Sequence, residues 1–379
     1  MAASMRMLLS LAILYVGFHS GCSFTDPQDA AVLMALRDSW LNTPPSWGES
    51  DDPCGGFWEG ITCNNSRVTA LDLSNNKDLS VSPFPSFGIL AGCNFTGSIP
   101  DKLGKLAELS FLALDSNKLD GHIPPSLGNL SKLYWLDLAD NQLSGPIPVS
   151  PGLDQLKNAK HLHLNKNQLS GTIPEQLFSP DMILTDVYFD NNMLTGPIPS
   201  SLGYVQTLQV LRLDSNALSG QVPSNLKNLM ILTELNLAYN KLDGVVPDLS
   251  NMNALSYVNL SNNSFESSPA PDWFSNLPSL TTLVIEYGPL MGTIPGKIFS
   301  LPHLQQVMLR NNAFSGSLNI TTGVSAELTL VDLQDNNISS IVLGYPYYAN
   351  TLMLTGNPIC ETSTINATFC RVQQGRKPL

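Results

Sequence analysis

Apolar residues recur along most of the chain in short alternating runs, each followed by an asparagine, a glycine and a proline. Six segments show this most clearly: LALDSNKLDGHIP, LDLADNQLSGPIP, LHLNKNQLSGTIP, VYFDNNMLTGPIP, LRLDSNALSGQVP and LNLAYNKLDGVVP. Their asparagines stand at positions 117, 141, 167, 192, 216 and 240, so the pattern repeats every 24 to 26 residues. A fixed period of this length predicts a stack of similar units in which each unit contacts its neighbours.

Each unit predicts a short strand followed by a tight bend. The paired leucines, such as Leu136 and Leu138, alternate along an extended chain and would both point inward. Asn141 would then turn its amide toward backbone groups of its own and the adjacent unit. Gly145 and Pro148 would end the strand region and guide the chain around the coil. Stacked units therefore predict a parallel sheet on a concave face and a ladder of asparagines.

The period is that of a leucine-rich repeat, and weaker copies extend it in both directions. Together with the six clear copies and Cys93, they predict an α/β solenoid of about 13 coils. The ladder position of the weaker copies falls at Asn76, Asn263, Gly288, Asn312, Asn336 and Asn357.

Cys93 precedes Gly97 by the interval that separates Asn117 from Gly121, so it is expected at a ladder position. A buried thiol there can still donate weakly to a carbonyl. The alternative is a reactive thiol, because Cys93 has no obvious partner. Only 17 residues lead from Asn76 to Cys93, so residues 80–92 suggest either a missing coil or a shortened one.

The open ends of such an array need caps. Cys54 and Cys63 lie before the first repeat, and Cys360 and Cys370 lie after the last. In an exported chain these two close pairs predict local disulfides, and a zinc site is disfavoured because tight ligand spacing and further ligands are missing.

The stretch DPQDAAVLMALRDSW predicts a helix before the first cysteine. Asp26 can cap it and Pro27 suits its first position. Its apolar face would consist of Val32, Leu33, Leu36 and Trp40.

The first residues predict export. Arg6 precedes an apolar run of about a dozen residues and then small residues, which is typical of a cleaved signal peptide and short for a membrane span. No later stretch is long enough to cross a bilayer. The expected division is 1–24 signal peptide, 25–69 N-terminal cap, 70–358 repeats, and 359–379 C-terminal cap and tail. A net charge of −12 disfavours nucleic acid as a partner.

The L-x-G-x-I-P segments, together with Cys54, Trp58, Gly60 and Cys63 of the first cap, resemble the plant-specific class of leucine-rich repeats. The chain is similar over residues 25–370 to the ectodomains of plant leucine-rich repeat receptor-like kinases. That resemblance implies a right-handed superhelical solenoid and recognition of peptides, hormones, wall fragments or a co-receptor. The sequence stops soon after its C-terminal cap and contains no membrane span and no kinase signatures.

Positions between and beside the inward leucines would face the concave side. Exposed aromatic residues gather there over neighbouring coils, and on a rigid sheet they would anchor a ligand at low entropy cost. Ordinary solvated strand surface is the alternative. Acids nearby favour a ligand with basic groups: Asp115, Asp137, Asp186, Asp190, Asp214 and Glu234. The predicted ligand-binding residues are Phe111, Trp135, Asp137, His161, His163, Asp186, Tyr188, Asp190 and Arg212.

His161 and His163 share one face of a strand, as two metal ligands would. Both are expected to face solvent without a third His or Cys nearby, so no metal is predicted. No cofactor and no catalytic residue is predicted either, because no pocket singles out a pair of carboxylates.

Eight N-x-[ST] sequons predict glycosylation, which fits export. A glycan on Asn259 would lie on the concave face and block ligand there. The acceptor asparagines are Asn64, Asn94, Asn129, Asn259, Asn262, Asn319, Asn337 and Asn366.

The sequence thus predicts a secreted, non-enzymatic module that binds an extracellular ligand or co-receptor, as receptor-like kinase ectodomains do. The alternative is a secreted inhibitor of a cell-wall-degrading enzyme, similar to the polygalacturonase inhibitors. Those share the repeat and both caps, but they have about ten coils and a basic tendency in the binding face.

Overall fold

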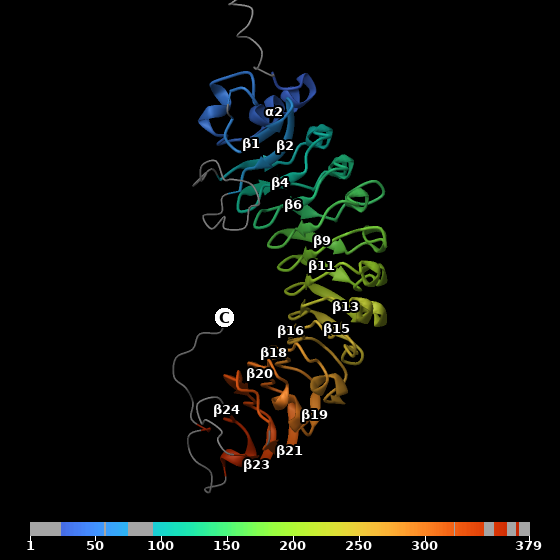
Figure 1. Cartoon of the computed structure of the whole chain (residues 1–379), viewed down its shortest axis with the longest axis vertical. Helices are drawn as coiled ribbons and strands as arrows, with labels where there is room; N and C mark the ends of the chain where they lie inside the picture. Colours follow the sequence, from blue (N-terminus) through green and yellow to red (C-terminus); the bar gives the residue numbers. More distant parts are fainter. Residues whose placement is uncertain are drawn as a thin grey trace, which may run out of the picture.

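The computed structural model describes residues 24–56, 58–74, 94–321, 323–344, 352–361 and 369–370. They form a curved solenoid with the N-terminal helix at one end and the last strand at the other (Figure 1). Residues 1–23 of the predicted signal peptide (1–24) lie outside the described residues. So do the ladder candidates Asn76 and Cys93 and the sequon at Asn366.

A sheet of thirteen strands lines the concave face, which confirms the predicted solenoid. Its first strand, β1 (Ile61–Asn64), pairs antiparallel with β2 and belongs to the cap. The twelve other strands of this sheet run parallel, one per coil. They are β2 (Arg67–Asp72), β4 (Phe111–Ala113), β6 (Trp135–Asp137), β8 (His161–His163), β10 (Asp186–Tyr188), β12 (Val210–Arg212), β14 (Glu234–Asn236), β16 (Tyr257–Asn259), β18 (Thr282–Val284), β20 (Gln306–Met308), β22 (Leu330–Asp332) and β24 (Leu352–Met353).

The L-x-G segments form a second set of short parallel strands, which the repeat pattern did not predict. In these strands Gly145 has φ of 77°, a left-handed conformation that favours glycine, and an added Cβ would lie 2.7 Å from His122. The set comprises β3 (Thr96–Ser98) with β5 (Lys118–Asp120); β7 (Ser144–Gly145), β9 (Gln168–Thr172), β11 (Met193–Gly196), β13 (Ala217–Gln221) and β15 (Lys241–Asp243); and β17 (Ser268–Pro269), β19 (Leu290–Gly292), β21 (Ala313–Ile320) and β23 (Asn337–Leu343).

Short 3₁₀ turns return the chain to the next concave strand, and most begin directly after a proline. They are η2 (Asp101–Lys105), η3 (Pro125–Asn129), η4 (Leu153–Gln155), η5 (Glu175–Leu177), η6 (Ser200–Tyr204), η7 (Ser224–Asn228), η8 (Asp272–Ser275) and η9 (Gly296–Ser300), with η1 (Pro45–Gly48) and η10 (Pro358–Cys360) in the caps.

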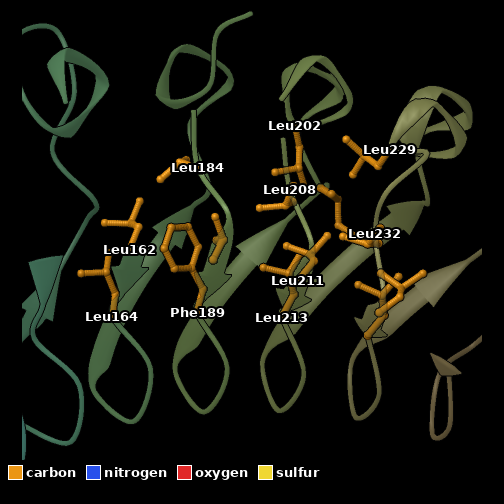
Figure 2. Packing of buried hydrophobic residues seen from close by; sticks show 14 of the residues in the cluster. Leu162, Leu164, Leu184, Phe189, Leu202, Leu208, Leu211, Leu213, Leu229 and Leu232 are labelled. Carbon is orange, nitrogen blue, oxygen red and sulfur yellow. The ribbon is translucent and has the colours of Figure 1, made fainter. Parts of the chain in front are cut away.

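Leucines of consecutive coils pack behind one another in a single continuous core (Figure 2). Leu136 and Leu138 are both fully buried, as their alternation predicted. Burying one such side chain stabilises the fold by about 1.5–3 kcal/mol. Each coil buries its leucines against the coils before and after it, so the array folds as a unit.

The asparagine ladder is present. The Nδ2 group of Asn141 donates to the carbonyls of Leu138 and Ala139 in its own coil and of Leu114 in the preceding coil, at 2.9–3.3 Å. Its Oδ1 accepts from the backbone N–H of Leu119 at 2.9 Å. Each ladder asparagine thus holds two adjacent coils together. Gly288 stands at one ladder position and has no amide to contribute.

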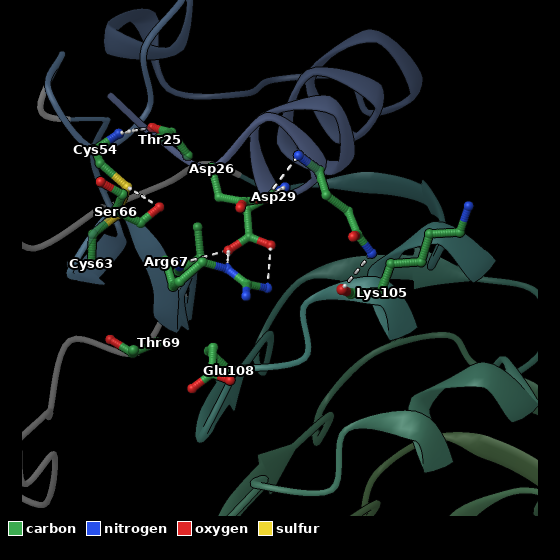
Figure 3. A network of polar contacts seen from close by, with 12 residues as sticks. Thr25, Asp26, Asp29, Cys54, Cys63, Ser66, Arg67, Thr69, Lys105 and Glu108 are labelled. Atoms are coloured by element: carbon green, nitrogen blue, oxygen red, sulfur yellow. Dashed lines mark hydrogen bonds and ion pairs between the residues drawn. A yellow bond between two sulfur atoms is a disulfide. The ribbon is translucent and has the colours of Figure 1, made fainter. Parts of the chain in front are cut away.

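The N-terminal cap closes the first coil. Helix α2 (Pro27–Ser39) begins at Asp26, whose side chain accepts from the backbone N–H groups of Gln28 and Asp29. Asp29 is fully buried and accepts two hydrogen bonds from Arg67 and one from the Val68 backbone, at 2.9–3.0 Å (Figure 3).

Both predicted disulfides are formed. Cys54 bonds to Cys63 beside β1, and Cys360 bonds to Cys370 at the far end of the array. Each closes a short loop over an end of the core.

In the described part of the chain, no strand of the concave sheet lies between β2 and β4, which pair directly. Asn117 donates to the carbonyl of Leu73 and accepts from the N–H of Phe95, just as Asn141 bonds to Leu114 and Leu119. Leu73 and Phe95 therefore belong to one coil.

Twenty-one residues separate Leu73 from Phe95, whereas four separate the corresponding Leu114 and Leu119, so this coil has 17 extra residues. The ladder candidates Asn76 and Cys93 both fall within this segment, outside the described residues. The expectation of a missing or shortened coil near residues 80–92 stays a prediction, because those residues lie outside the described part of the chain. The role of Cys93 stays a prediction.

Candidate ligand-binding surface

The strands β4 to β14 bring three rows of side chains to the concave face, and we call these rows the concave surface. Their parallel register places Trp135 beside His161 and His161 beside Asp186 in the first row. The second row runs Ala113, Asp137, His163, Tyr188, Arg212 and Asn236, and the third runs Asp115, Ala139, Asn165, Asp190, Asp214 and Ala238.

Aromatic and imidazole rings pack in an unbroken series along these rows. Phe111 and Trp135 are stacked with ring centroids 5.7 Å apart, and Trp135 lies 4.1 Å from His161 and 5.3 Å from His163. His163 is stacked on Tyr188 at 4.3 Å. The series spans four neighbouring coils, as the spacing of the aromatics predicted, and its mutual packing makes it rigid.

Two histidines and two carboxylates form a hydrogen-bonded network within the series. Asp186 contacts both rings, with Oδ2 2.8 Å from Nδ1 of His161 and Oδ1 2.6 Å from Nε2 of His163. The second ring nitrogen of His163 lies 3.3 Å from Oδ2 of Asp137, and that of His161 lies 3.3 Å from the hydroxyl of Tyr134.

The network fixes charges in a largely buried position. Burial lowers the pKa of His163, but hydrogen bonds to Asp137 and Asp186 outweigh it and raise this pKa to about 9. Burial acts to raise the pKa of Asp186, yet the two histidine rings bring it below its ordinary value. At neutral pH the centre of the concave surface is therefore a cationic imidazole between two carboxylates.

Arg212 ends the ring series. Its guanidinium lies 5.0 Å from the centre of the Tyr188 ring and forms two hydrogen bonds to Glu234, at 2.6 and 3.2 Å. Glu234 thus neutralises the positive charge of Arg212 within the chain. The acids of the third row therefore determine the sign of the charge on the concave surface.

The third row is rich in acceptors. Burial and the neighbouring Asp137 raise the pKa of Asp115 to about 7, and burial and Asp190 raise the pKa of Asp214 to about 6. Within the described residues, Oδ1 of Asn165 and Oδ1 of Asp190 are buried and accept no hydrogen bond. Buried acceptors of this kind are uncommon and favour a donor from outside the chain.

Several details differ from the sequence-based expectation. Phe111 is only 2% exposed, because it packs between the small Ala70 and Ala113 and against Trp135. It supports the ring of Trp135 and offers little surface of its own. His163 is 9% exposed rather than solvent-facing, because Tyr188 covers it.

Sequence reasoning also missed two partners of the histidines. Asp186, from the next strand, supplies a third metal-binding group. Tyr134 lies just before β6 and contacts His161, and no feature of the repeat pattern singles it out.

The sequons fall into two groups. Asn64, Asn129, Asn319 and Asn337 are exposed, whereas Asn94, Asn259 and Asn262 are half-buried. Asn259 lies on the concave strand β16, where its Nδ2 is 3.4 Å from the Tyr257 hydroxyl. Nδ2 of Asn262 is buried. Glycosylation of these residues stays a prediction.

Family models match in the N-terminal cap and in several of the repeats. The leucine rich repeat N-terminal domain matches residues 26–64, and leucine rich repeat models match 108–130, 132–152, 158–179, 206–265 and 254–277. A probable leucine-rich repeat receptor-like protein kinase of Arabidopsis thaliana is 42% identical to this chain in an alignment of 419 positions, gaps included. The alignment covers 95% of this chain and 42% of the relative.

Solved structures show the same likeness. One match is the Arabidopsis receptor kinase HAESA, in complex with the peptide hormone IDA and the co-receptor SERK1. Its TM-score is 0.68 and its sequence identity is 28%, and the match covers 88% of this chain and 58% of the HAESA chain. Another match is the plant peptide hormone receptor RGFR1 in complex with RGF2, with a TM-score of 0.65 and 34% identity. It covers 70% of this chain and 42% of the RGFR1 chain.

The chain spans less than half the length of the curated kinase relative it matches. In the described part of the chain, no helix is long and apolar enough to cross a membrane. The N-terminal cap and the stacked repeats of the solenoid agree with these matches. The chain therefore contains leucine-rich repeats and is similar over most of its length to plant leucine-rich repeat receptor kinases.

Proposed function

We propose that this chain binds a basic extracellular peptide on the concave surface and acts by recognition rather than catalysis. The observation that carries the proposal is the rigid ring series beside buried acceptors that accept no hydrogen bond within the described residues. Rings held in place supply apolar contact area at low entropy cost, and buried acceptors reward a ligand that brings donors.

The chemistry of the third row favours a cationic group in the ligand. Asp190 and Asp214 lie on adjacent coils, and the charge of Asp190 raises the cost of ionising Asp214. A lysine, arginine or amino-terminal group between them would remove that cost and satisfy Oδ1 of Asp190. Affinity should therefore rise with pH as Asp214 and Asp115 ionise.

The relatives support recognition as the activity. HAESA is in complex with a peptide hormone and a co-receptor, and RGFR1 is a peptide hormone receptor in complex with RGF2. By analogy, we propose a location outside the cell and a co-receptor as a second partner. A glycan on Asn259 would limit the ligand to the coils from β4 to β14.

The proposal is tested by selecting a displayed random peptide library on the glycosylated chain at pH 7.5. Enrichment of peptides with Lys or Arg next to an apolar residue is the expected result. Binding of the selected peptides should be lost in the Trp135→Ala/Tyr188→Ala variant and kept in Tyr204→Ala, which removes an exposed tyrosine from η6.

Retention of binding by a folded double variant would show that the ligand lies elsewhere. If instead no peptide binds and the chain inhibits a fungal polygalacturonase in a sugar-release assay, the inhibitor function replaces this one.

A further inference from the structure

Three metal-binding side chains meet at the centre of the concave surface. One potential ligand atom from each of His161, His163 and Asp186 lies within 4.8 Å of the others. They come from two adjacent strands, β8 and β10, whose pairing fixes their spacing. We propose that these three residues form a binding site for a first-row divalent metal ion, with zinc as the ion that fits the ligand set.

The ligand chemistry selects the metal class. Two imidazole nitrogens and one carboxylate suit zinc, copper or nickel, whereas calcium and magnesium prefer oxygen ligands alone. Nδ1 of His161 and Nε2 of His163 both face Asp186, at 2.8 and 2.6 Å. In each contact a proton lies between nitrogen and oxygen. When a metal ion is held by both nitrogens and by Asp186, the Nε2 proton of His163 leaves to solvent. The proton on Nδ1 of His161 moves to Nε2, which faces the Tyr134 hydroxyl.

The remaining ring nitrogens are already engaged, as the outer partners of a metal site require. Nδ1 of His163 lies 3.3 Å from Oδ2 of Asp137, and Nε2 of His161 lies 3.3 Å from the hydroxyl of Tyr134. A metal-bound histidine generally donates its second N–H to such a group, which fixes its tautomer and orientation. Asp137 and Tyr134 are positioning residues in this sense.

Ring packing holds both ligands in place. Trp135 lies against His161 with 4.1 Å between ring centroids, and Tyr188 is stacked on His163 with 6° between the planes. Neither imidazole can turn away without breaking this packing. The cost of ordering the ligands is therefore met when the chain folds rather than when the metal binds.

Three protein ligands leave a fourth tetrahedral position, as in zinc sites that exchange water for another ligand. Because all three side chains lie on the concave face, a carboxylate, imidazole or thiolate of a bound peptide can fill that position. This inference goes beyond the proposed peptide binding and does not depend on it, because the protein ligands alone define the site.

The test uses the full glycosylated chain, freed of metal with EDTA and dialysed at pH 7.5. Titration calorimetry with Zn²⁺ should show one ion per chain. His161→Gln/His163→Gln should weaken binding more than the roughly 10–100-fold that loss of an outer partner causes, and Asp137→Asn should fall within that range. The matched control is His122→Gln/His303→Gln, which removes two exposed histidines elsewhere.

Co²⁺ gives a second readout. A visible absorption band of tetrahedral Co²⁺ should appear with the wild-type chain and the control, and it should be absent from the double variant. Thermal unfolding in EDTA establishes that each variant is folded, and the single His161→Gln variant replaces the double one if that fails to fold. The proposal is overturned if no stoichiometric zinc binds, or if the control loses binding as much as the site variants do. No peptide is present in this titration, so its failure leaves the peptide proposal standing.

Discussion

The imidazole of His163 lies flat against the phenol ring of Tyr188, with 4.3 Å between ring centroids and 6° between the planes. The same imidazole contacts Asp137 on one side and Asp186 on the other. One residue thus joins the ring series to the charged network across β6, β8 and β10. A change in either partner is expected to affect both features.

Tyr188→Leu should destabilise the chain although it keeps an apolar side chain. The substitution removes the stacking on His163 and the contact with the Arg212 guanidinium. The expected loss in the free energy of unfolding is about 1–2 kcal/mol, measured by urea denaturation. Tyr204→Leu, at an exposed position on η6, should change it by less than about 0.5 kcal/mol. Equal effects of the two substitutions would show that the ring series contributes no stability.

Asp29→Asn should damage the N-terminal cap. Asp29 is fully buried and accepts three hydrogen bonds from Arg67 and Val68, so its loss leaves a cation without its partner. We expect the free energy of unfolding, measured by thermal or urea denaturation, to fall by about 3–5 kcal/mol.

The matched control for the cap is Asp38→Asn on the same helix. Asp38 pairs with Arg37 in solvent, and such a pair contributes about 0–1 kcal/mol. A loss in Asp29→Asn no larger than in this control would contradict the structural role of the buried pair.

Asn141→Ala should weaken the array at one rung of the ladder. The substitution removes four hydrogen bonds to the backbone of two coils and takes from the buried N–H of Leu119 the acceptor Oδ1 of Asn141. The expected cost is about 2–4 kcal/mol, with faster amide hydrogen exchange at Leu119. Asn225→Ala removes one exposed hydrogen bond to the carbonyl of Ser200 and should cost little. Unchanged exchange at Leu119 would argue against the ladder as the link between coils.

Asp115→Asn should stabilise the chain at alkaline pH. Burial and Asp137 raise the pKa of Asp115 to about 7 from an ordinary 3.8. Between pH 4 and 7 the folded chain therefore binds more protons than the unfolded one, and its stability falls as pH rises. The amide stays neutral and can still accept from the Ser116 hydroxyl.

The free energy of unfolding of Asp115→Asn, measured with urea, should exceed that of the wild-type chain by about 2–4 kcal/mol at pH 8. The difference should vanish near pH 4. Asp120→Asn, at an exposed position of the same coil, should show no such trend. A gain for Asp115→Asn that is independent of pH would contradict the buried, raised-pKa state of this carboxyl.

The repeats could be predicted from sequence because their signals are local. Alternating leucines bury wherever coils stack, and Asn141 and its equivalents bond only to their own and adjacent coils. The helix at Asp26 and both disulfides follow from short-range patterns as well. Each of these features depends on a few consecutive residues and a fixed period.

Features that depend on neighbouring coils could not be predicted in this way. Asn76 and Cys93 both fit the ladder spacing, and only the contacts of Asn117 show that Leu73 and Phe95 belong to one coil. Phe111 is buried because its neighbours are small. Asp186 contacts two histidines because of side-chain rotamers that no repeat pattern specifies.

The most direct test of the concave surface as the ligand site is to place a glycan in the middle of it. Val210→Asn/Arg212→Thr creates a sequon on β12, and Arg212→Thr alone separates the glycan from the loss of the arginine. If the peptides bind on the concave surface, a folded, glycosylated double variant no longer binds them, whereas Arg212→Thr still does. Undiminished binding by the variant with the glycan would show that the peptides bind elsewhere.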